Sequence, residues 1–210
     1  MTNDDTCAVI VFARYPNKGK VKTRLAKEIG EETALKFYKS CAENTFEECK
    51  KLKSESILLY LYYSDVKDKT FITKWAGFDF IINPQSGTSL GEKMKNAFDE
   101  VLSKGIKKAV IIGSDVPDIN TKIIKDSFDI LNYADAVIGP STDGGYYLLG
   151  MKKVYDYLFE DIKWSTNSVF AETCNRIIKN KLTYFVLPKL IDIDVKEDFL
   201  TWSAKNNNQI

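Results

Sequence analysis

The 210-residue chain contains no histidine. This absence excludes catalytic systems built on imidazole, namely Ser-His-Asp and Cys-His nucleophile sites, HExxH zinc sites and histidine proton shuttles. Any chemistry must therefore use carboxylates, Lys, Arg, hydroxyl groups, backbone amides or a bound cation. Cysteine is scarce too. Because the four cysteines form no C-x-x-C pair, we expect reduced, buried core residues and neither a zinc ribbon nor a disulfide framework.

The sequence also lacks an excess of charge and long apolar runs. Its 30 Lys and Arg against 29 Asp and Glu leave a net charge of +1, which supplies no general attraction to nucleic acid or to an anionic membrane. The apolar runs at 7–13 and 57–63 are far shorter than a membrane span, and residues 1–5 are acidic where a signal peptide is basic. The sequence therefore predicts a cytoplasmic protein with neither nucleic acid nor membrane as a partner.

Short apolar runs alternate with longer amphipathic stretches along the chain. The runs at 7–13, 56–63, 78–82, 108–113, 134–139 and 183–187 predict strands, and several are continuous, as expected for strands covered on both faces. Helices are expected at 22–53, broken near Gly30, and at 68–76, 90–104, 121–131 and 167–180. This order predicts one α/β domain over residues 1–210, with a mostly parallel central sheet and helices on both faces. Residues 206–210 are expected to be a frayed tail.

The loop after the first predicted strand is strongly cationic. Five Lys and Arg residues fall between Arg14 and Arg24. Ligands of open α/β sheets bind beyond the carboxyl ends of the strands, and a loop of this kind can hold a polyphosphate through backbone N–H groups and cationic side chains. Cations are unfavourable at a helix N-terminus, so their density favours an anionic ligand. A solvated charged loop is the alternative.

Acidic residues follow two further segments. Asp115 follows the run 108–113 with only Ser114 between them, where a carboxylate can bind Mg²⁺, although Asp115 or Asp118 could instead cap the next helix. Asp192 and Asp194 lie on one face of an extended segment, and Asp194 could also cap the last helix. These carboxylates are candidate metal ligands.

Three more stretches have both a functional and a structural interpretation. The glycine-rich segment 139–150 around Asp143 could approach a ligand closely or form a hairpin turn. The polar start of the helix near residue 89 could contact a nucleobase, or Ser89 and Glu92 could form a capping box. Trp164 could lie at a ligand site or be a core residue beside a helix cap.

These motifs together resemble those of nucleotidyltransferase-like proteins with the GT-A fold. The stretches are P-N-K-G-K-V-K-T-R-L at 16–25, G-S-D-V-P at 113–117, G-P-S-T-D-G-G-Y-Y-L-L-G at 139–150, W-S-T at 164–166 and D-I-D at 192–194. Similar proteins are the MobA-like enzymes, the CofC phospholactate guanylyltransferases, and transferases found beside radical-SAM and selenium-related proteins, some named arsenosugar-biosynthesis glycosyltransferases. Thr88, Ser89 and Lys93 depart from the family pattern, so the preference for base or acceptor is expected to differ. Val195 stands where the family usually has Thr, which weakens the case for a hydroxyl contact there but keeps the carboxylates.

The resemblance implies a nucleotide-diphospho-sugar transferase fold and a role for each matching position. Catalytic roles fall to Lys22, Arg24, Asp115 and Asp143, and metal binding to Asp115, Asp192 and Asp194. The implied nucleotide-binding positions are Phe12, Ala13, Arg14, Gly19, Lys22, Arg24, Gln85, Gly87, Ser89 and Gly91. The implied acceptor-binding positions are Gly144, Gly145, Tyr146, Trp164, Ser165 and Thr166.

We therefore expect a transferase that depends on Mg²⁺ or Mn²⁺ and uses a nucleotide or nucleotide-sugar together with a small-molecule acceptor. The preferred reaction is nucleotidyl transfer from a nucleoside triphosphate to a small anionic acceptor, since an acceptor that is already anionic needs no protein base. One alternative is glycosyl transfer from a nucleotide-sugar, with Asp143 as the base for a hydroxyl acceptor. A second is a nucleotide-binding module without catalysis. Whether the chain forms a homodimer is left open.

Overall fold

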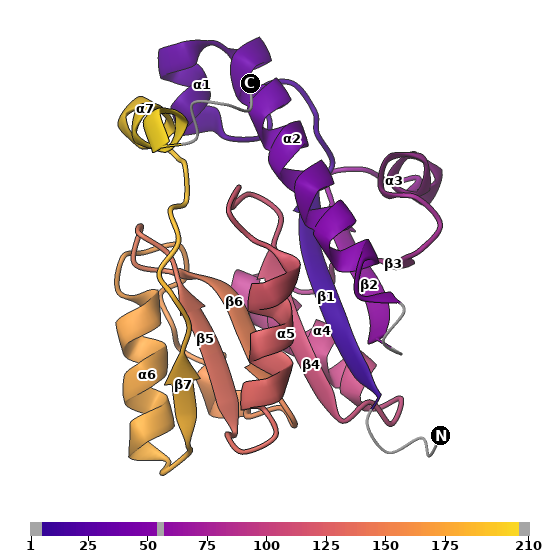
Figure 1. The fold of residues 1–210 in the computed structure, drawn as a ribbon, viewed down its shortest axis with the longest axis vertical. Helices are drawn as coiled ribbons and strands as arrows, with labels where there is room; N and C mark the ends of the chain where they lie inside the picture. Colours follow the sequence, from indigo (N-terminus) through magenta and orange to yellow (C-terminus); the bar gives the residue numbers. More distant parts are fainter. Residues whose placement is uncertain (1–5, 54–56, 206–210) are drawn as a thin grey trace.

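A seven-stranded sheet forms the centre of the molecule, in a computed structural model that describes residues 6–53 and 57–205 (Figure 1). The spatial order is β3-β2-β1-β4-β6-β5-β7. Strand β6 is antiparallel to both its neighbours, β4 and β5, and the other pairs are parallel. The strands are β1 (Cys7–Arg14), β2 (Ile57–Ser64), β3 (Ile81–Pro84), β4 (Lys108–Gly113), β5 (Ala136–Pro140), β6 (Tyr146–Met151) and β7 (Tyr184–Val186).

Helices cover both faces of the sheet, because successive residues of the buried strands point to opposite sides. Val9 of β1 belongs to an apolar core that includes Phe46 of α2, whereas the next residue, Ile10, belongs to a second core with Phe98 of α4 and Ile177 of α6. The helices are α1 (Thr23–Ile29), α2 (Glu31–Lys50), α3 (Lys69–Ala76), α4 (Leu90–Leu102), α5 (Thr121–Ile130), α6 (Val169–Lys179) and α7 (Lys196–Lys205), with a short 3-10 helix at Asp156–Leu158.

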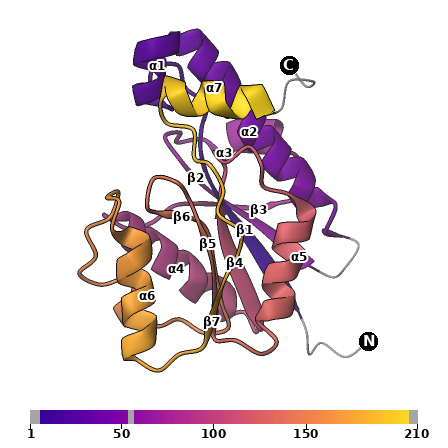
Figure 2. The ribbon, with the colours of Figure 1, turned by 60° about the vertical axis from the view of Figure 1, so that its left-hand side comes forward.

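Helices α1 and α7 stand with the start of α2 above the carboxyl ends of the strands (Figures 1 and 2). A third apolar cluster joins them, in which Leu25, Phe37 and Ile193 are buried. The Phe37 ring makes edge-to-face contacts with Phe199 and Trp202 of α7, at centroid separations of 5.3 and 5.6 Å. This packing brings the loop after β1 and the segment before α7 to the same end of the sheet.

The predicted fold class is confirmed, and so is the helix break. Helix α1 ends at Ile29 and α2 begins at Glu31, with Gly30 between them at a φ of +88°, which favours glycine. All four cysteines are buried thiols outside any disulfide, as expected. None of the helices within the described residues is both long and apolar enough to span a membrane. The predicted frayed tail, 206–210, lies outside the described residues, as do residues 1–5 and 54–56.

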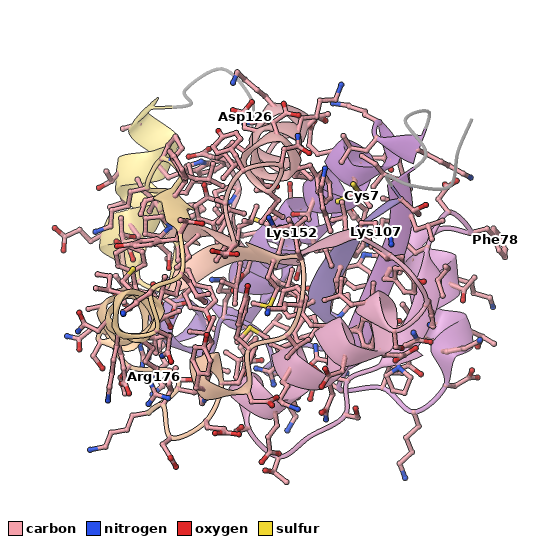
Figure 3. All side chains as sticks on the ribbon, turned by 90° about the horizontal axis from the view of Figure 1, so that it is seen from below. Cys7, Phe78, Lys107, Asp126, Lys152 and Arg176 are labelled. Carbon is pink, nitrogen blue, oxygen red and sulfur yellow. The ribbon has the colours of Figure 1, made fainter. Side chains whose placement is uncertain are left out.

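Two strand predictions were wrong. The strand expected at 78–82 is displaced to Ile81–Pro84, and Phe78 projects outward with 91% of its surface exposed (Figure 3). Strand β6 was not predicted, because residues 139–150 carry a strong turn signal and a parallel α/β pattern leaves no place for an antiparallel strand. The hairpin alternative for this segment holds: the Ser141 N–H donates to the Gly145 carbonyl, closing the turn between β5 and β6.

Candidate active site

A pocket of about 890 Å³ opens at the carboxyl ends of β1, β2 and β4. Among the residues predicted to bind the nucleotide, those that line the pocket are Phe12, Ala13, Arg14, Arg24 and Gln85. The four predicted aspartates Asp115, Asp143, Asp192 and Asp194 also line it, as do Gly145, Tyr146, Trp164, Ser165 and Thr166 of the predicted acceptor set. The remaining predicted residues, Gly19, Gly87, Ser89, Gly91 and Gly144, do not face the pocket, and Lys22 lines a smaller one beside it.

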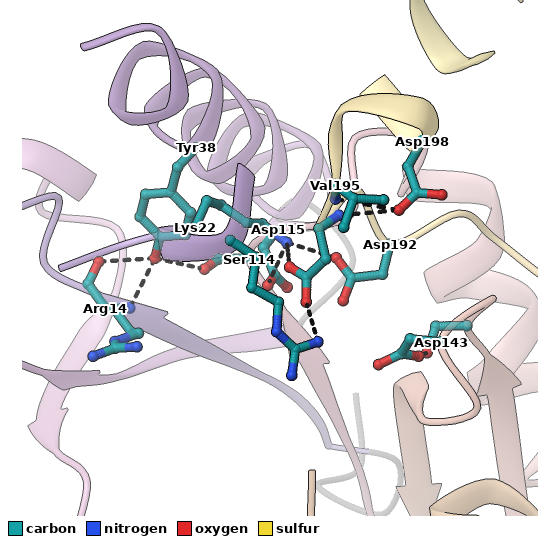
Figure 4. A network of polar contacts seen from close by, with 12 residues as sticks. Arg14, Lys22, Tyr38, Ser114, Asp115, Asp143, Asp192, Val195 and Asp198 are labelled. Atoms are coloured by element: carbon teal, nitrogen blue, oxygen red, sulfur yellow. Dashed lines mark hydrogen bonds and ion pairs between the residues drawn. The ribbon is translucent and has the colours of Figure 1, made fainter. Parts of the chain in front are cut away.

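Lys22 lies at the centre of a cluster of carboxylates (Figure 4). Its Nζ is 2.6 Å from Asp192 Oδ1, 3.1 Å from Asp194 Oδ1 and 3.1 Å from Asp115 Oδ2. The ammonium group donates hydrogen bonds to Asp192 and Asp194 and forms an ion pair with Asp115. The Lys22 side chain is only 3% exposed, whereas Asp115 and Asp194 are 41% and 36% exposed. The cluster therefore presents two carboxylates to solvent and conceals the cation beneath them.

One buried lysine does not balance three carboxylates. Burial lowers the pKa of Lys22, but the charges of Asp115, Asp192 and Asp194 more than offset this effect, so its pKa lies well above the ordinary value. Burial and the nearby Asp115 charge raise the pKa of Asp192, against the opposing effect of Lys22. With all groups ionised, the cluster carries more negative than positive charge. Among the described residues, Arg24 is the only further cation that forms an ion pair with this cluster. Its Nη1 lies 3.9 Å from Asp194 Oδ2.

Within the described part of the chain, no group of three or more Cys, Asp or Glu side chains is arranged to hold a metal ion. The position between the predicted ligands Asp115, Asp192 and Asp194 is taken by the Lys22 ammonium instead. Mg²⁺, however, commonly uses one or two carboxylates and completes its coordination with substrate phosphates and water. The two exposed carboxylates and the surplus negative charge fit that mode of binding.

Three of the five described non-glycine residues with positive φ line this pocket or the smaller one beside it. Lys22, Asp65 and Ser165 have φ values of 44°, 67° and 61°, in the left-handed region that non-glycine residues rarely adopt. The left-handed conformation of Lys22 at the N-cap of α1 accompanies a side chain that points down to the carboxylates rather than out to solvent. Such strain costs on the order of 1–3 kcal/mol per residue and is typical of functional sites.

A tyrosine from α2 connects the two strand ends that form the pocket floor. The Tyr38 hydroxyl accepts a hydrogen bond from the Arg14 N–H at 2.9 Å and donates to the Arg14 carbonyl at 2.8 Å. It also lies 3.2 Å from the buried Ser114 hydroxyl, directly before Asp115. Burial raises the pKa of Tyr38 to about 12, so the hydroxyl stays protonated at neutral pH. Tyr38 thereby holds the ends of β1 and β4 in register.

Arg14, predicted to bind phosphate, is paired with a carboxylate. Its Nε donates to Asp65 Oδ2 at 2.6 Å, and this bond is the main cause that lowers the pKa of Asp65. The Lys93 charge lowers it further. The Asp65 carbonyl also accepts a hydrogen bond from Asn17, at 3.0 Å. Arg14 and Asp65 thus form an ion pair at the rim, which a bound phosphate would have to share.

The predicted acceptor residues are gathered on the opposite wall. Asp143 Oδ1 accepts hydrogen bonds from the Ser141 hydroxyl and from the Gly145 N–H. Gly144 lies behind the wall, where a Cβ would come within 2.1 Å of the Asn167 carbonyl oxygen. Asp143 makes no ion pair with Lys22 and is separate from the cluster (Figure 4).

The Trp164 indole is held between two secondary structure elements. A Cβ on Gly91 of α4 would meet Trp164 Nε1 at 2.3 Å, so only glycine allows this close approach. On the other side, the Tyr146 ring makes an edge-to-face contact with Trp164 at 6.5 Å. Trp164 is therefore both packed, as one interpretation expected, and part of the pocket lining, as the other expected.

The structure shows which side chains cap the starts of α4 and α5 and which one binds the backbone before α7. Ser89 caps α4 by accepting from the Glu92 N–H, as the capping interpretation predicted. Helix α5 is capped by Asn120, so the prediction that Asp115 or Asp118 caps it was wrong. The Asp198 side chain accepts from the backbone N–H groups of residues 194 and 195 before α7, which leaves the Asp194 carboxylate for Lys22.

Sequence reasoning missed three residues of the site. Asp65 directly follows β2 just as Asp115 follows β4, so the same strand-end signal could have found it. Lys93 was seen only as a departure from a motif, yet it lines the pocket. Tyr38 lies in the middle of a long helix, and nothing in the local sequence marks it as polar support for the pocket.

Comparison with known proteins shows what this chain is similar to. The model of a family described as "Uncharacterized protein conserved in bacteria (DUF2064)" matches residues 45–166. The 2-phospho-L-lactate guanylyltransferases of Methanocaldococcus vulcanius and Methanocaldococcus jannaschii are each 30% identical, over 114 and 130 residues. These stretches cover 52% and 57% of this chain and 48% and 55% of the relatives, so the chain spans about half the length of the curated relatives it matches.

Solved structures agree along nearly the whole chain. A Desulfovibrio desulfuricans protein assigned to the nucleotide-diphospho-sugar transferases is 29% identical with a TM-score of 0.90, covering 97% of this chain and 88% of that one. The 4-diphosphocytidyl-2C-methyl-D-erythritol synthase of Anaerococcus prevotii, 14% identical with a TM-score of 0.63 over 98% of each chain, shares the fold. These findings confirm the nucleotide-diphospho-sugar transferase fold, and the relatives' names support the predicted transferase class. The roles of the individual site residues stay predictions.

Proposed function

The chain belongs to the family of bacterial proteins designated DUF2064, and from this membership and the pocket we propose that it is a nucleotide-dependent transferase. The proposed reaction is nucleotidyl transfer from a nucleoside triphosphate to a small acceptor. The guanylyltransferase names of the curated relatives and the cytidylyl-type fold neighbour support it. The observation that carries the proposal is the placement of Arg24 beside the cluster of Asp115, Asp192 and Asp194 at one end of the pocket.

In this proposal the triphosphate lies between exposed cations and the carboxylate cluster. Arg24 is 77% exposed and extends over the cluster, so its guanidinium is free to make paired hydrogen bonds to phosphate oxygens. Lys93 and Arg14 line the same pocket and add positive charge. Charge that develops on the leaving pyrophosphate would be stabilised by these groups, which are already oriented before the reaction.

The residues that fit a divalent cation are Asp115 and Asp194, the two exposed carboxylates of the cluster. Such an ion, when bound, would neutralise phosphate charge and polarise the reacting phosphoryl group. Lys22 would hold Asp192 and keep both ligands oriented toward the pocket. Lys22 would therefore support the phosphate site from beneath rather than face the leaving group.

Glycosyl transfer is a second candidate, because one observation favours it. Asp143 has a carboxylate oxygen, Oδ2, that accepts no hydrogen bond from the described residues, on a wall separate from the metal-binding candidates. Such a group can take the proton of an attacking hydroxyl. The strong similarity to the Desulfovibrio desulfuricans structure is consistent with a nucleotide-sugar donor as well.

The proposed function is tested by ligand-dependent melting followed by turnover. The purified protein is heated with each of the four nucleoside triphosphates, with UDP- and GDP-sugars, and with each of these plus Mg²⁺. A ligand at a hundredfold excess over its Kd should stabilise the fold by about 2.7 kcal/mol. Release of pyrophosphate identifies nucleotidyl transfer, and release of a nucleoside diphosphate identifies glycosyl transfer.

Variants separate catalysis from binding alone. Asp115→Asn should lower turnover on the order of 10²–10³-fold, whereas Asp126→Asn, on the exposed face of α5, should leave it unchanged. Tight nucleotide binding with no turnover of any acceptor would indicate a non-catalytic module. If no nucleotide or nucleotide-sugar raises the melting temperature, the proposed function is wrong.

A further inference from the structure

The pocket is divided into a charged side and a wall without cations. Among the described residues that line it, the cations are Arg14, Arg24 and Lys93, all from the first half of the chain. Their contacts place them on the charged side. Arg14 binds Asp65 at 2.6 Å, Lys93 is near enough for its charge to act on the same carboxylate, and Arg24 lies 3.9 Å from Asp194.

The wall formed by residues 141–169 has a different chemistry. It contributes the Asp143 carboxylate, the Ser165 hydroxyl, the Asn167 amide and the rings of Tyr146 and Trp164. Neither Ser165 Oγ nor the Asn167 amide makes a hydrogen bond with another described residue. Asp143 lines the pocket, and its Oδ1 accepts from neighbouring donors, whereas Oδ2 accepts no hydrogen bond from the described residues. The only formal charge that this wall contributes to the pocket is therefore negative.

We propose that this wall binds a neutral, hydroxyl-bearing molecule, a sugar or a polyol. A carboxylate accepts hydrogen bonds from hydroxyl groups, and hydroxyl and amide side chains can act as donor or acceptor to the rest of a polyol. An aromatic ring covers the apolar C–H face of such a molecule. An anion would instead be desolvated beside Asp143 with no cation to compensate for either charge. The anionic acceptor expected from the sequence does not fit this wall.

This inference rests on the proposed function and names its acceptor. The acceptor hydroxyl oxygen attacks the α-phosphorus of the nucleoside triphosphate, forming a new O–P bond. The bond from the α-phosphorus to the oxygen bridging to the β-phosphate breaks, and pyrophosphate leaves with that electron pair. The hydroxyl proton passes to Asp143 Oδ2 and then to solvent. Asp143 is therefore the proton acceptor that a hydroxyl acceptor requires in a chain without histidine.

The strained Ser165 supports the assignment of this wall as a binding surface. Its φ of 61° is unfavourable for a residue with a side chain, and no hydrogen bond of its hydroxyl within the described chain explains the strain. The segment that bears Ser165 packs closely against two glycines. A Cβ on Gly91 of α4 would clash with Trp164, and a Cβ on Gly144, in the turn before β6, would clash with Asn167. The wall is thus fixed before any ligand arrives, as hydrogen-bonding recognition requires.

The test compares neutral acceptors with their own phosphate esters. The full chain is incubated with Mg²⁺ and the triphosphate that best raises its melting temperature. Acceptors are offered in pairs of a neutral compound and its phosphate ester: glycerol and glycerol 3-phosphate, glucose and glucose 1-phosphate, mannose and mannose 1-phosphate. The anion 2-phospho-L-lactate is added without a neutral counterpart. Pyrophosphate release and product mass are recorded. A second arm replaces the triphosphate with UDP- and GDP-sugars and records the release of nucleoside diphosphate.

The expected result is turnover of at least one neutral acceptor at a rate tenfold or more above that of its phosphate ester. Activity in the first arm assigns the polyol as the acceptor of a nucleotidyl group, and activity in the second arm assigns the wall to the sugar chemistry of glycosyl transfer. Nucleotide binding accompanied by turnover of anionic acceptors alone, or by no turnover of a neutral one, overturns the inference while the proposed nucleotide site stands. Absence of nucleotide binding would instead overturn the proposed function.

Variants of the wall provide a second, independent measure. Asp143→Asn should lower kcat with a hydroxyl acceptor by about 10²–10⁴-fold and leave the Kd of the triphosphate unchanged. The loss should diminish as the pH rises, because hydroxide replaces the missing carboxylate. Asp129→Asn, an exposed carboxylate on α5, is the matched control. Equal loss of nucleotide affinity and kcat in Asp143→Asn would show that Asp143 does not act on the acceptor.

Discussion

Lys22 Nζ and Asp192 Oδ1 lie 2.6 Å apart, joining the loop after the first strand to the segment before the last helix. The lysine is almost completely buried and has further carboxylates at 3.1 Å. This pair adds a polar link to the apolar packing that joins α1, α2 and α7. The behaviour of Lys22 variants is therefore the most informative measurement on the fold of the site.

Lys22→Met should destabilise the protein as well as inactivate it. Removing one partner of a buried ion pair leaves uncompensated charge and costs about 3–5 kcal/mol, and we expect the lower end because Asp115 and Asp194 are partly solvated. Urea unfolding measures the change, and Lys18→Met, at an exposed position of the same loop, is the control. Equal stability of the two variants would contradict the buried-cation arrangement.

Tyr38→Phe should loosen the pocket floor. The substitution removes the hydroxyl that bonds both backbone groups of Arg14 and contacts Ser114, at a cost of about 1–2 kcal/mol. Because Arg14 and Ser114 then lose this link at the pocket floor, nucleotide affinity should fall together with stability. Tyr133→Phe changes an exposed tyrosine and should alter neither. Calorimetric melting with and without the triphosphate distinguishes the two effects.

Gly91→Ala should displace the Trp164 indole. Alanine is normally favoured over glycine within a helix by about 1 kcal/mol, but here its Cβ would lie 2.3 Å from Trp164 Nε1. Overpacking of this kind costs about 1–3 kcal/mol, so a net loss of stability is expected. In the double variant Gly91→Ala/Trp164→Ala the clash is absent, and the glycine-to-alanine change should become neutral or stabilising. A cost of Gly91→Ala that persists without the indole would argue against this packing.

Asp135→Asn should lower stability in a pH-dependent manner. The carboxylate accepts the backbone N–H of Thr183 at 2.9 Å and its hydroxyl at 2.7 Å, and these bonds lower the pKa of Asp135. A lowered pKa gives stability that is present above the unfolded-state pKa of about 3.9 and is lost as the pH falls through the folded-state value. The difference from wild type should be about 1 kcal/mol at pH 7, given the partial exposure of the site.

Urea unfolding at a series of pH values checks this prediction. The difference between wild type and Asp135→Asn should shrink toward zero as the pH falls below the lowered folded-state pKa of Asp135. Asp129→Asn, with an exposed carboxylate that makes no ion pair with another described residue, should match wild type throughout the series. A constant difference at all pH values would show that the carboxylate charge is not involved.

Much of the fold could be predicted from the sequence because local patterns determine it. Continuous apolar runs marked β1, β2 and β4, and Gly30 marked the boundary between α1 and α2. The antiparallel β6 could not be predicted in the same way, because its apolar residues follow directly on a glycine-rich turn and its partners are chosen by tertiary packing. The displacement of β3 has a similar cause, since β3 is an edge strand and burial does little to fix its position along the sequence.

Site residues could be predicted where they lie at the end of a strand. Contacts between residues far apart in the sequence could not be predicted, because they depend on the three-dimensional packing. Asp115 and Arg14 were found from their positions after β4 and β1. That Lys22 turns inward to three carboxylates depends on a left-handed backbone and on α7 packing over α1, neither of which a local motif encodes. The same holds for the pairing of Arg14 with Asp65, because neither residue identifies the other in the sequence.

The dependence of the carboxylate cluster on both the start and the late part of the chain has a consequence for biosynthesis. During synthesis, β1 and the cationic loop emerge long before residues 192 and 194 are made, so two of the three carboxylate partners of Lys22 are missing during most of translation. Triphosphate binding should accordingly appear only in nascent chains that extend beyond α7, and arrested intermediates of shorter length should fail to retain it.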